Sequence, residues 1–167
     1  MIHKFQTPPP TVPLPSRGGL PEGRGGAWGA ASVLSVIAGL LTLIAGGMIY
    51  VLYRPRTLLL FHVADGLGLT TPLAHWRLSA MAFTPPEFVV YSLPAGLWAM
   101  SYVLIEGVLV QAFSAQRRWA AVAFVPLLGA ASELLQAARL LPGTFDASDL
   151  VLYLLPLAVY DTINIKL

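Results

Sequence analysis

Two kinds of residue are scarce in this sequence, and each scarcity excludes a class of protein. The chain has no cysteine, so disulfides, thiolate nucleophiles and cysteine-ligated metal sites are excluded. Charged residues make up 11% of the chain and hydrophobic residues 56%, whereas a soluble domain carries about 25% charged residues. So few charges cannot cover a water-exposed surface, but they suit helices that face lipid. The formal net charge of +2 is too small to indicate a nucleic-acid partner.

Motifs of the common enzyme classes are also missing. The sequence contains no phosphate-binding glycine loop, no HExxH and no GxSxG. His3, His62 and His75 lack the spacing of metal ligands. We therefore expect no metal and no cofactor. Whether the protein is an enzyme stays open, with a non-catalytic role favoured.

The N-terminal segment differs in composition from the rest of the chain. Residues 1–26 contain six prolines and five glycines, and no apolar run of the kind found in signal peptides. Such a segment cannot bury enough surface to offset the entropy lost on ordering it. We predict a disordered tail over residues 1–26 and a single helical transmembrane domain over residues 27–167.

Four apolar segments follow the tail. A helix rises 1.5 Å per residue, so about 20 apolar residues cross the roughly 30 Å hydrocarbon layer. We predict an all-α integral membrane protein with about four transmembrane helices, at residues 27–53, 88–113, 119–141 and 149–163. Residues 57–87 are predicted to be interfacial or re-entrant, because their apolar stretch is short and contains His62 and Asp65. If that segment crosses the membrane instead, the chain has five spans.

Small residues recur along the first predicted span at spacings of three and four. The positions are Gly29, Ser32, Ser35, Gly39, Thr42 and Gly46. On a helix they form one stripe, and such stripes let helix backbones approach closely in lipid. We predict that this face packs against another helix.

Glu106 is a carboxylate inside the second predicted span. A charge at this depth costs a few kcal/mol, so the group should be paired, protonated or facing water. The sequence permits a neutral, hydrogen-bonded Glu106 that serves packing. It equally permits a role in binding a proton or a ligand.

A second polar group lies near the end of the third predicted span. Glu133, Gln136 and Arg139 follow one another at intervals of three, which places them on one side of a helix. Together they could hold a polar headgroup. They could also satisfy one another within the protein.

Two aspartates follow the turn after that span. Pro142 and Gly143 are expected to end the third helix. Asp146 is then expected to cap the fourth helix, with Asp149 in its first turn, where the helix dipole favours negative charge. Across so tight a turn, both aspartates would also lie near Glu133. A cluster of that kind suits acid–base chemistry, cation binding or headgroup recognition.

The stretch over residues 129–151 resembles the core of the VanZ-like membrane protein family. That family has Glu-x-x-Gln on one transmembrane helix, a short turn, and Asp-x-x-Asp-Leu at the start of the next. The matching pairs here are Glu133 with Gln136 and Asp146 with Asp149.

The resemblance extends upstream, so that it covers roughly residues 88–160. The segment Tyr91-Ser-Leu-Pro-Ala-Gly-Leu-Trp98 is similar to the start of the preceding helix in some small bacterial relatives. The implied location is the bacterial cytoplasmic (inner) membrane, multi-pass. Membrane lipids and other membrane protein subunits are the expected partners.

The basic residues predict which way the chain sits in that membrane. With the N-terminus in the cytoplasm, more basic residues lie inside than outside, as the positive-inside rule prefers. Arg17, Arg24, Arg117, Arg118 and Lys166 are then inside, and Arg54, Arg56, Arg77 and Arg139 are outside.

The family resemblance implies a role at the bacterial envelope, since the family name comes from teicoplanin resistance. Family members usually carry an arginine shortly before the first aspartate, where this chain has Gly143 or Thr144. They also carry an asparagine four residues after the second aspartate, where this chain has Tyr153. We therefore expect a non-catalytic component of the envelope or of a membrane complex. Two alternatives stay open: binding or modification of a headgroup or lipid-linked ligand by the two matching pairs, and a role as accessory subunit of a larger membrane complex.

Overall fold

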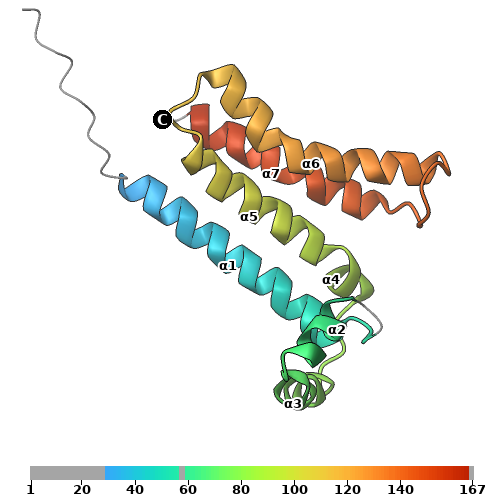
Figure 1. Cartoon of the computed structure of the whole chain (residues 1–167). Coiled ribbons are helices and arrows are strands. Elements are labelled where there is room, and N and C mark those ends of the chain that lie inside the picture. The colour runs from blue at the N-terminus through green and yellow to red at the C-terminus, as the bar shows by residue number, and fades with distance from the viewer. Residues whose placement is uncertain (1–28, 57–58, 166–167) are drawn as a thin grey trace, which may run out of the picture.

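The computed structural model describes residues 29–56 and 59–165, and within those ranges it is helical and has no β-strand. The predicted all-α class is confirmed for this part of the chain, whereas the predicted tail lies outside it. The helices, drawn in Figure 1, are α1 (Ala30–Tyr53), α2 (Leu59–Gly66), α3 (Thr70–Ala80), α4 (Glu87–Tyr91), α5 (Leu93–Leu109), α6 (Ala115–Ala137) and α7 (Ala147–Ile165).

Two helices of the described ranges are long and apolar enough to cross a membrane. They are α1, with 24 residues and a hydropathy of 2.2, and α6, with 23 residues and a hydropathy of 1.5. Large apolar side chains stand exposed along both, including Leu34, Leu41 and Ile44 on α1 and Phe124 and Leu128 on α6. Surfaces of this kind suit hydrocarbon better than water.

The remaining predicted spans differ in detail from the helices observed. The predicted span over residues 88–113 is divided at Ser92 into α4 and α5, beside Pro94, which has no N–H to continue the helical ladder. On its own α5 has 17 residues. The predicted span over residues 119–141 corresponds to α6, which begins at Ala115 and ends at Ala137. The predicted span over residues 149–163 lies inside α7.

The end of α1 is fixed by Pro55 and by an arginine from α3. A residue before proline avoids helical geometry, and Arg54 is accordingly extended, with φ −75° and ψ 154°. Arg77 donates hydrogen bonds to the carbonyls of Val51 and, at 2.8 Å, of Arg54. Its guanidinium also lies 5.0 Å from the centre of the Phe61 ring. Burial lowers the pKa of Arg77, and repulsion from Arg56 lowers it further. The guanidinium lies at the negative, C-terminal end of the α1 dipole, which stabilises its positive charge and opposes part of this lowering of the pKa.

The segment predicted to be interfacial or re-entrant forms two short helices. Figure 1 shows α2 and α3 gathered at the C-terminal end of α1. They are joined through Gly68, whose φ of 72° suits glycine, and Leu69 N–H donates back to the Ala64 carbonyl at 2.9 Å. With 8 and 11 residues, neither α2 nor α3 can cross a membrane by itself. A re-entrant path stays a prediction.

Packing places α5 in the centre of the larger helices. Figure 1 shows α1 along one side of α5 and the α6–α7 pair along the other. The buried core lies where α5, α6 and α7 meet. It consists of Val103, Val110, Val122, Ala123 and Leu157.

Two residues of the small-residue stripe bring α1 close to α5. Gly39 and Gly46 are the buried residues of α1. A Cβ at Gly39 would lie 2.7 Å from Ile105, and one at Gly46 would lie 2.7 Å from the Trp98 indole. The other positions of the stripe contribute less to the contact between α1 and α5. Gly29 has nothing within 4 Å of where its Cβ would be, and Ser35 is half-buried. The Thr42 hydroxyl donates to the Gly39 carbonyl, and the Ser32 hydroxyl accepts a hydrogen bond from Gln111.

Candidate site at the α6–α7 turn and the cavity beside it

The turn between α6 and α7 begins earlier than the sequence pattern suggested. The helix ends at Ala137, and Arg139 has a left-handed backbone with φ 59°. Arg139 N–H donates to the Gln136 carbonyl at 2.9 Å, and Leu140 N–H donates to the Leu135 carbonyl at 2.8 Å. These two bonds form a Schellman motif, in which glycine usually takes the left-handed position.

The expected grouping of Arg139 with Glu133 and Gln136 is therefore wrong. The helix ends before Arg139, and the left-handed backbone there takes the residue off the face that the other two share. Arg139 is exposed. The expectation failed because it assumed that the helix continued to Pro142.

Gln136 packs against the turn itself. Gly143 has a φ of 137°, and a Cβ there would lie 2.7 Å from the Gln136 amide. A side chain at position 143 would therefore be strained and would collide with Gln136. Gln136 is half-buried and closes the inside of the turn.

Asp146 caps α7. Its Oδ1 accepts a hydrogen bond from the backbone N–H of Ser148 at 2.8 Å, and its Oδ2 accepts one from the Ser92 hydroxyl at 3.4 Å. Its own carbonyl accepts the first helical bond, from Leu150 N–H at 3.2 Å. This is the geometry of an N-cap residue. The bond to Ser92 also ties the start of α7 to the junction of α4 and α5.

Glu133 supports the same cap from α6. The side chain is only 6% exposed, and its Oε2 accepts a hydrogen bond from the Asp146 backbone N–H at 3.2 Å. In a capping box, the acidic residue at the third helical position would make that bond. In α7 the third position is Asp149. Because Glu133 accepts the hydrogen bond from the Asp146 N–H, the Asp149 side chain does not make that bond and faces elsewhere.

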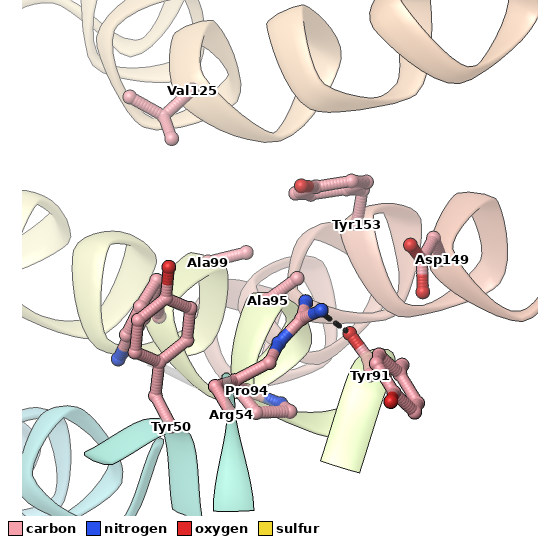
Figure 2. A pocket seen from close by; sticks show the side chains of 10 residues that line it. Tyr50, Arg54, Tyr91, Pro94, Ala95, Ala99, Val125, Asp149 and Tyr153 are labelled. Atoms are coloured by element: carbon pink, nitrogen blue, oxygen red, sulfur yellow. Dashed lines mark hydrogen bonds between the residues drawn. The ribbon is translucent and has the colours of Figure 1, made fainter. Parts of the chain in front are cut away.

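Asp149 faces a cavity of about 370 Å³ near one end of the helical bundle. Figure 2 shows this cavity, to which α1, α5, α6 and α7 all contribute side chains. It is lined by Tyr50, Arg54, Tyr91, Pro94, Ala95, Trp98, Ala99, Val125, Asp149 and Tyr153.

Arg54 enters the cavity from the end of α1. Its guanidinium lies 4.7 Å from the centre of the Tyr91 ring and 5.5 Å from that of Tyr50, distances typical of cation–π contacts. One terminal nitrogen donates to the Tyr91 carbonyl at 3.4 Å, drawn as a dashed line in Figure 2. Tyr50 in turn packs on Trp98, with ring centres 5.2 Å apart. The arginine is thus held by two aromatic rings, and its hydrogen-bonding capacity is left partly unused.

Two residues that line this cavity each have a buried side-chain atom without a hydrogen-bond partner. The atoms are Arg54 Nε, a donor, and Asp149 Oδ1, an acceptor. Buried polar groups in folded proteins are nearly always satisfied, so each such atom requires an explanation. Arg118 Nε is unsatisfied in the same way, but Arg118 does not line the cavity.

An apolar groove lies next to the cavity, between α6 and α7. It has a volume of about 340 Å³ and shares Val125 and Tyr153 with the cavity. Its lining is Val125, Leu128, Gly129, Ala131, Ser132, Leu135, Leu141 and Tyr153. The Ser132 hydroxyl is engaged, because it donates to the Gly129 carbonyl at 2.7 Å.

Glu106 lies apart from this site. It is half-buried on α5 and does not line the cavity. It neighbours Tyr102, whose hydroxyl donates to the Ala121 carbonyl on α6 at 2.7 Å. The choice between a packing role and a binding role for Glu106 stays open.

The sequence pattern identified the α6–α7 turn, but it did not identify the aromatic residues and the arginine that line the cavity. In the sequence, Arg54 counted only toward the orientation in the membrane, and Tyr153 counted as a departure from a family pattern. No local signal links Arg54 to Asp149, because the two lie far apart in the sequence. Within the described ranges, no group of three or more His, Asp or Glu side chains is placed to hold a metal ion.

No protein-family model, curated protein or solved structure matches this chain. The resemblance to the VanZ-like family therefore stays a prediction. It rests on Glu133, Gln136, Asp146 and Asp149 and on the segment that begins at Tyr91.

Proposed function

We propose that this chain is a multi-span helical membrane protein that works by binding, and that its cavity receives the polar headgroup of a membrane lipid. One observation carries the proposal: Arg54 and Asp149, of opposite charge, both line one cavity, and each has a buried side-chain atom without a hydrogen-bond partner. A headgroup that carries both charges would give each side chain a partner of the opposite charge.

The proposed topology has four spans: α1, α4 with α5, α6, and α7. With the N-terminus in the cytoplasm, the end of α1, the start of α5, the end of α6 and the start of α7 all lie at the outer face. The cavity is built from these helices, so it would open near the headgroup layer of a bacterial cytoplasmic membrane. In this arrangement α2 and α3 lie at the same interface. The exposed side chains of Trp76 and Leu78 on α3, and of Phe83 just after it, would contact lipid.

A binding role fits the carboxylates better than catalysis does. Acid–base catalysis with two carboxylates needs groups that are free to exchange protons and that differ in environment. Glu133 and Asp146 are engaged in fixing the backbone at the start of α7. Asp149 is the carboxylate of this turn that lines the cavity. A cavity lined by one carboxylate and one arginine suits the recognition of a ligand better than acid–base catalysis.

Lipid retained by the purified protein tests the proposal. The chain is purified in a mild detergent, and the phospholipid bound per chain is quantified by mass spectrometry. We expect Arg54→Gln to lose most of the lipid that the wild type retains. The matched control is Arg56→Gln, two residues away on an exposed side chain, which should retain it. Equal retention by both variants and the wild type would refute the proposal.

A second candidate is an accessory subunit of a larger membrane complex. It is favoured by the outward face of α1, where Leu34, Leu41 and Ile44 are exposed along a helix that buries little of its own surface. A partner helix would cover such a face as well as lipid does. The mass of the gently solubilised particle separates the candidates, because a subunit is recovered with other chains and a lipid-binding monomer is recovered by itself. A role at the envelope like that implied by the VanZ-like resemblance is compatible with either candidate.

A further inference from the structure

We infer that Arg77 is a positioning residue for the cavity, because it fixes the part of the main chain that carries Arg54. The inference rests on the proposed function and adds to it the residue that holds the arginine of that site in place. Arg77 belongs to α3 and does not itself line the cavity. Its effect on a ligand therefore passes through Arg54.

The main chain of Arg54 needs support from outside α1. Arg54 follows the last helical residue, and its extended backbone, with φ −75° and ψ 154°, leaves the helical path. Its N–H donates to the Tyr50 carbonyl at 3.1 Å. The last carbonyls of a helix, however, have no partner within the helix, and helix ends fray when nothing else binds them. A frayed end would let the Arg54 side chain leave the cavity.

Arg77 supplies the missing donors. The two terminal nitrogens of its guanidinium donate to the carbonyl of Val51, in the last turn of α1, and to the carbonyl of Arg54 at 2.8 Å. One side chain thus joins the last turn of the helix to the residue that follows it. The rigid, planar fork of arginine suits such a contact at two points, whereas the ammonium of lysine is a single point charge.

The position of Arg77 is itself fixed by α2 and α3. Its guanidinium lies 5.0 Å from the centre of the Phe61 ring, and Phe61, on α2, is only 5% exposed. The helix that carries Arg77 packs against α1. A continuous series of contacts therefore runs from Phe61 through Arg77 to the main chain of Arg54.

The remaining contacts of Arg54 act on its side chain. The centres of the Tyr50 and Tyr91 rings lie 5.5 Å and 4.7 Å from the guanidinium, and the Tyr91 carbonyl accepts a hydrogen bond at 3.4 Å. These contacts form only when the Arg54 main chain is in place. Without Arg77, fewer molecules would hold Arg54 in the cavity, and the apparent Kd for a ligand rises in inverse proportion to that fraction.

Affinity for a zwitterionic phospholipid tests the inference. The delipidated full-length protein in detergent is titrated with phosphatidylethanolamine, and binding is followed by native mass spectrometry. We expect Arg77→Gln to raise the Kd about tenfold, the factor that results if Arg54 is in place in about a tenth of the molecules. His75→Gln, at an exposed position on the same helix, is the matched control and should bind as the wild type does.

A second control separates positioning from a general loss of stability. Gly39→Ala should also destabilise the protein, because its Cβ would lie 2.7 Å from Ile105, but Gly39 does not line the cavity. At a temperature at which all variants are folded, Gly39→Ala should bind the lipid as the wild type does. Equal losses of affinity in Gly39→Ala and Arg77→Gln would overturn the inference, because lowered stability would then explain both.

Hydrogen exchange shows whether the effect lies at the end of α1. Arg77→Gln should speed the exchange of the Arg54 amide, whose bond to the Tyr50 carbonyl closes the helix. Gly39→Ala should leave that amide unchanged. A loss of affinity in Arg77→Gln with unchanged exchange at Arg54 would overturn the inference, because Arg77 would then act by another route.

Arg77→Lys keeps the positive charge at the C-terminal end of α1 and one of the two hydrogen bonds. It should therefore fall between the wild type and Arg77→Gln in both measurements, and it takes the place of Arg77→Gln if that variant does not fold. Wild-type affinity in Arg77→Gln, or in Arg77→Lys where Arg77→Gln does not fold, would overturn the inference.

The outcomes also separate this inference from the proposed function. Lipid binding that is lost in Arg54→Gln but kept in Arg77→Gln would overturn the inference while the proposed function stands. A wild-type protein that binds no phosphatidylethanolamine would overturn both.

Discussion

At the scale of single residues, the turn between α6 and α7 divides its carboxylates by the groups they contact. Glu133 and Asp146 both accept hydrogen bonds from backbone N–H groups that would otherwise be unsatisfied at the start of α7. Asp149 occupies the position from which an acidic side chain commonly makes such a bond, but it faces the cavity. Three acidic residues that look equivalent in the sequence therefore have different roles.

The first prediction concerns the buried Glu133. Glu133→Gln keeps a carbonyl oxygen that can accept from Asp146 N–H, so the free energy of unfolding should change by less than about 1 kcal/mol. Glu133→Ala leaves that N–H unsatisfied and should destabilise the protein by about 1 to 3 kcal/mol. Thermal unfolding in detergent measures both. A Gln variant that stays folded but no longer retains lipid would show that the charge of Glu133 takes part in binding.

The second prediction concerns the cap of α7. Asp146→Ala should lower the free energy of unfolding by about 1 kcal/mol, because Ser148 N–H loses its acceptor. Asp146→Asn should be nearly silent, since asparagine caps helices about as well as aspartate. The measurement is again thermal unfolding. A strongly destabilising Asn variant would mean that the negative charge at position 146 matters beyond capping.

The third prediction concerns Arg139, which is in a conformation that side chains disfavour. Arg139→Gly should stabilise the protein by about 1 kcal/mol, because glycine takes a left-handed backbone without steric cost. Since the side chain is exposed, lipid retention should be unaffected. Loss of lipid in this variant would restore Arg139 as a binding residue.

At the scale of helices, the distance between α1 and α5 depends on positions where α1 has no side chain. Gly39 and Gly46 lie under Ile105 and Trp98. The Thr42 hydroxyl bonds to the Gly39 carbonyl within α1, and Ser32 accepts a hydrogen bond from Gln111, just after α5. In lipid, such close packing must replace the hydrophobic effect as the source of helix association. Trp98 also lines the cavity, so this helix pair contributes to the shape of the site.

The fourth prediction compares two adjacent glycines of α1. Gly46→Ala should destabilise the protein by roughly 1 to 3 kcal/mol, because its Cβ would lie 2.7 Å from the Trp98 indole and 3.2 Å from the Leu97 Cβ. At Gly47 nothing lies within 4 Å of a Cβ. Gly47→Ala is therefore the matched control, and it should be neutral or stabilising by up to about 1 kcal/mol. Equal effects at the two positions would show that α1 does not pack on α5 through this face.

At the scale of the whole molecule, the number of spans follows from which helices cross. The lengths of α1 and α6 suffice for a crossing, and α4 with α5 and then α7 complete the proposed four. The helices α2 and α3 are too short to cross separately. An even number of spans returns the chain to the side on which it began.

The fifth prediction tests that count. A topology reporter fused after Leu167 should map to the same side of the membrane as one fused at the N-terminus, and a reporter inserted at Gly68 should map to the opposite side. If the two ends lie on opposite sides, residues 57–87 cross the membrane and the chain has five spans.

The sequence by itself determined the features that depend on local composition. Scarce charge and long apolar runs indicated a helical membrane protein, and the described residues are helical with two helices able to cross. The spacing of Asp146 and Asp149 identified the start of α7 because capping is a local interaction. The end of α6 was misplaced because a left-handed residue other than glycine gives no recognisable signal.

Only the tertiary structure decided what faces the cavity. Arg54 and Asp149 come from helices far apart in the sequence, and they meet because α1 packs on α5 while α5 packs on α7. It also decided that Glu133, and not Asp149, satisfies the backbone of Asp146. Hydrogen bonds across helices depend on crossing geometry and register, which residue spacing within one helix does not encode. For that reason the sequence located the turn, and the packing of the helices determined which of its carboxylates is available to a ligand.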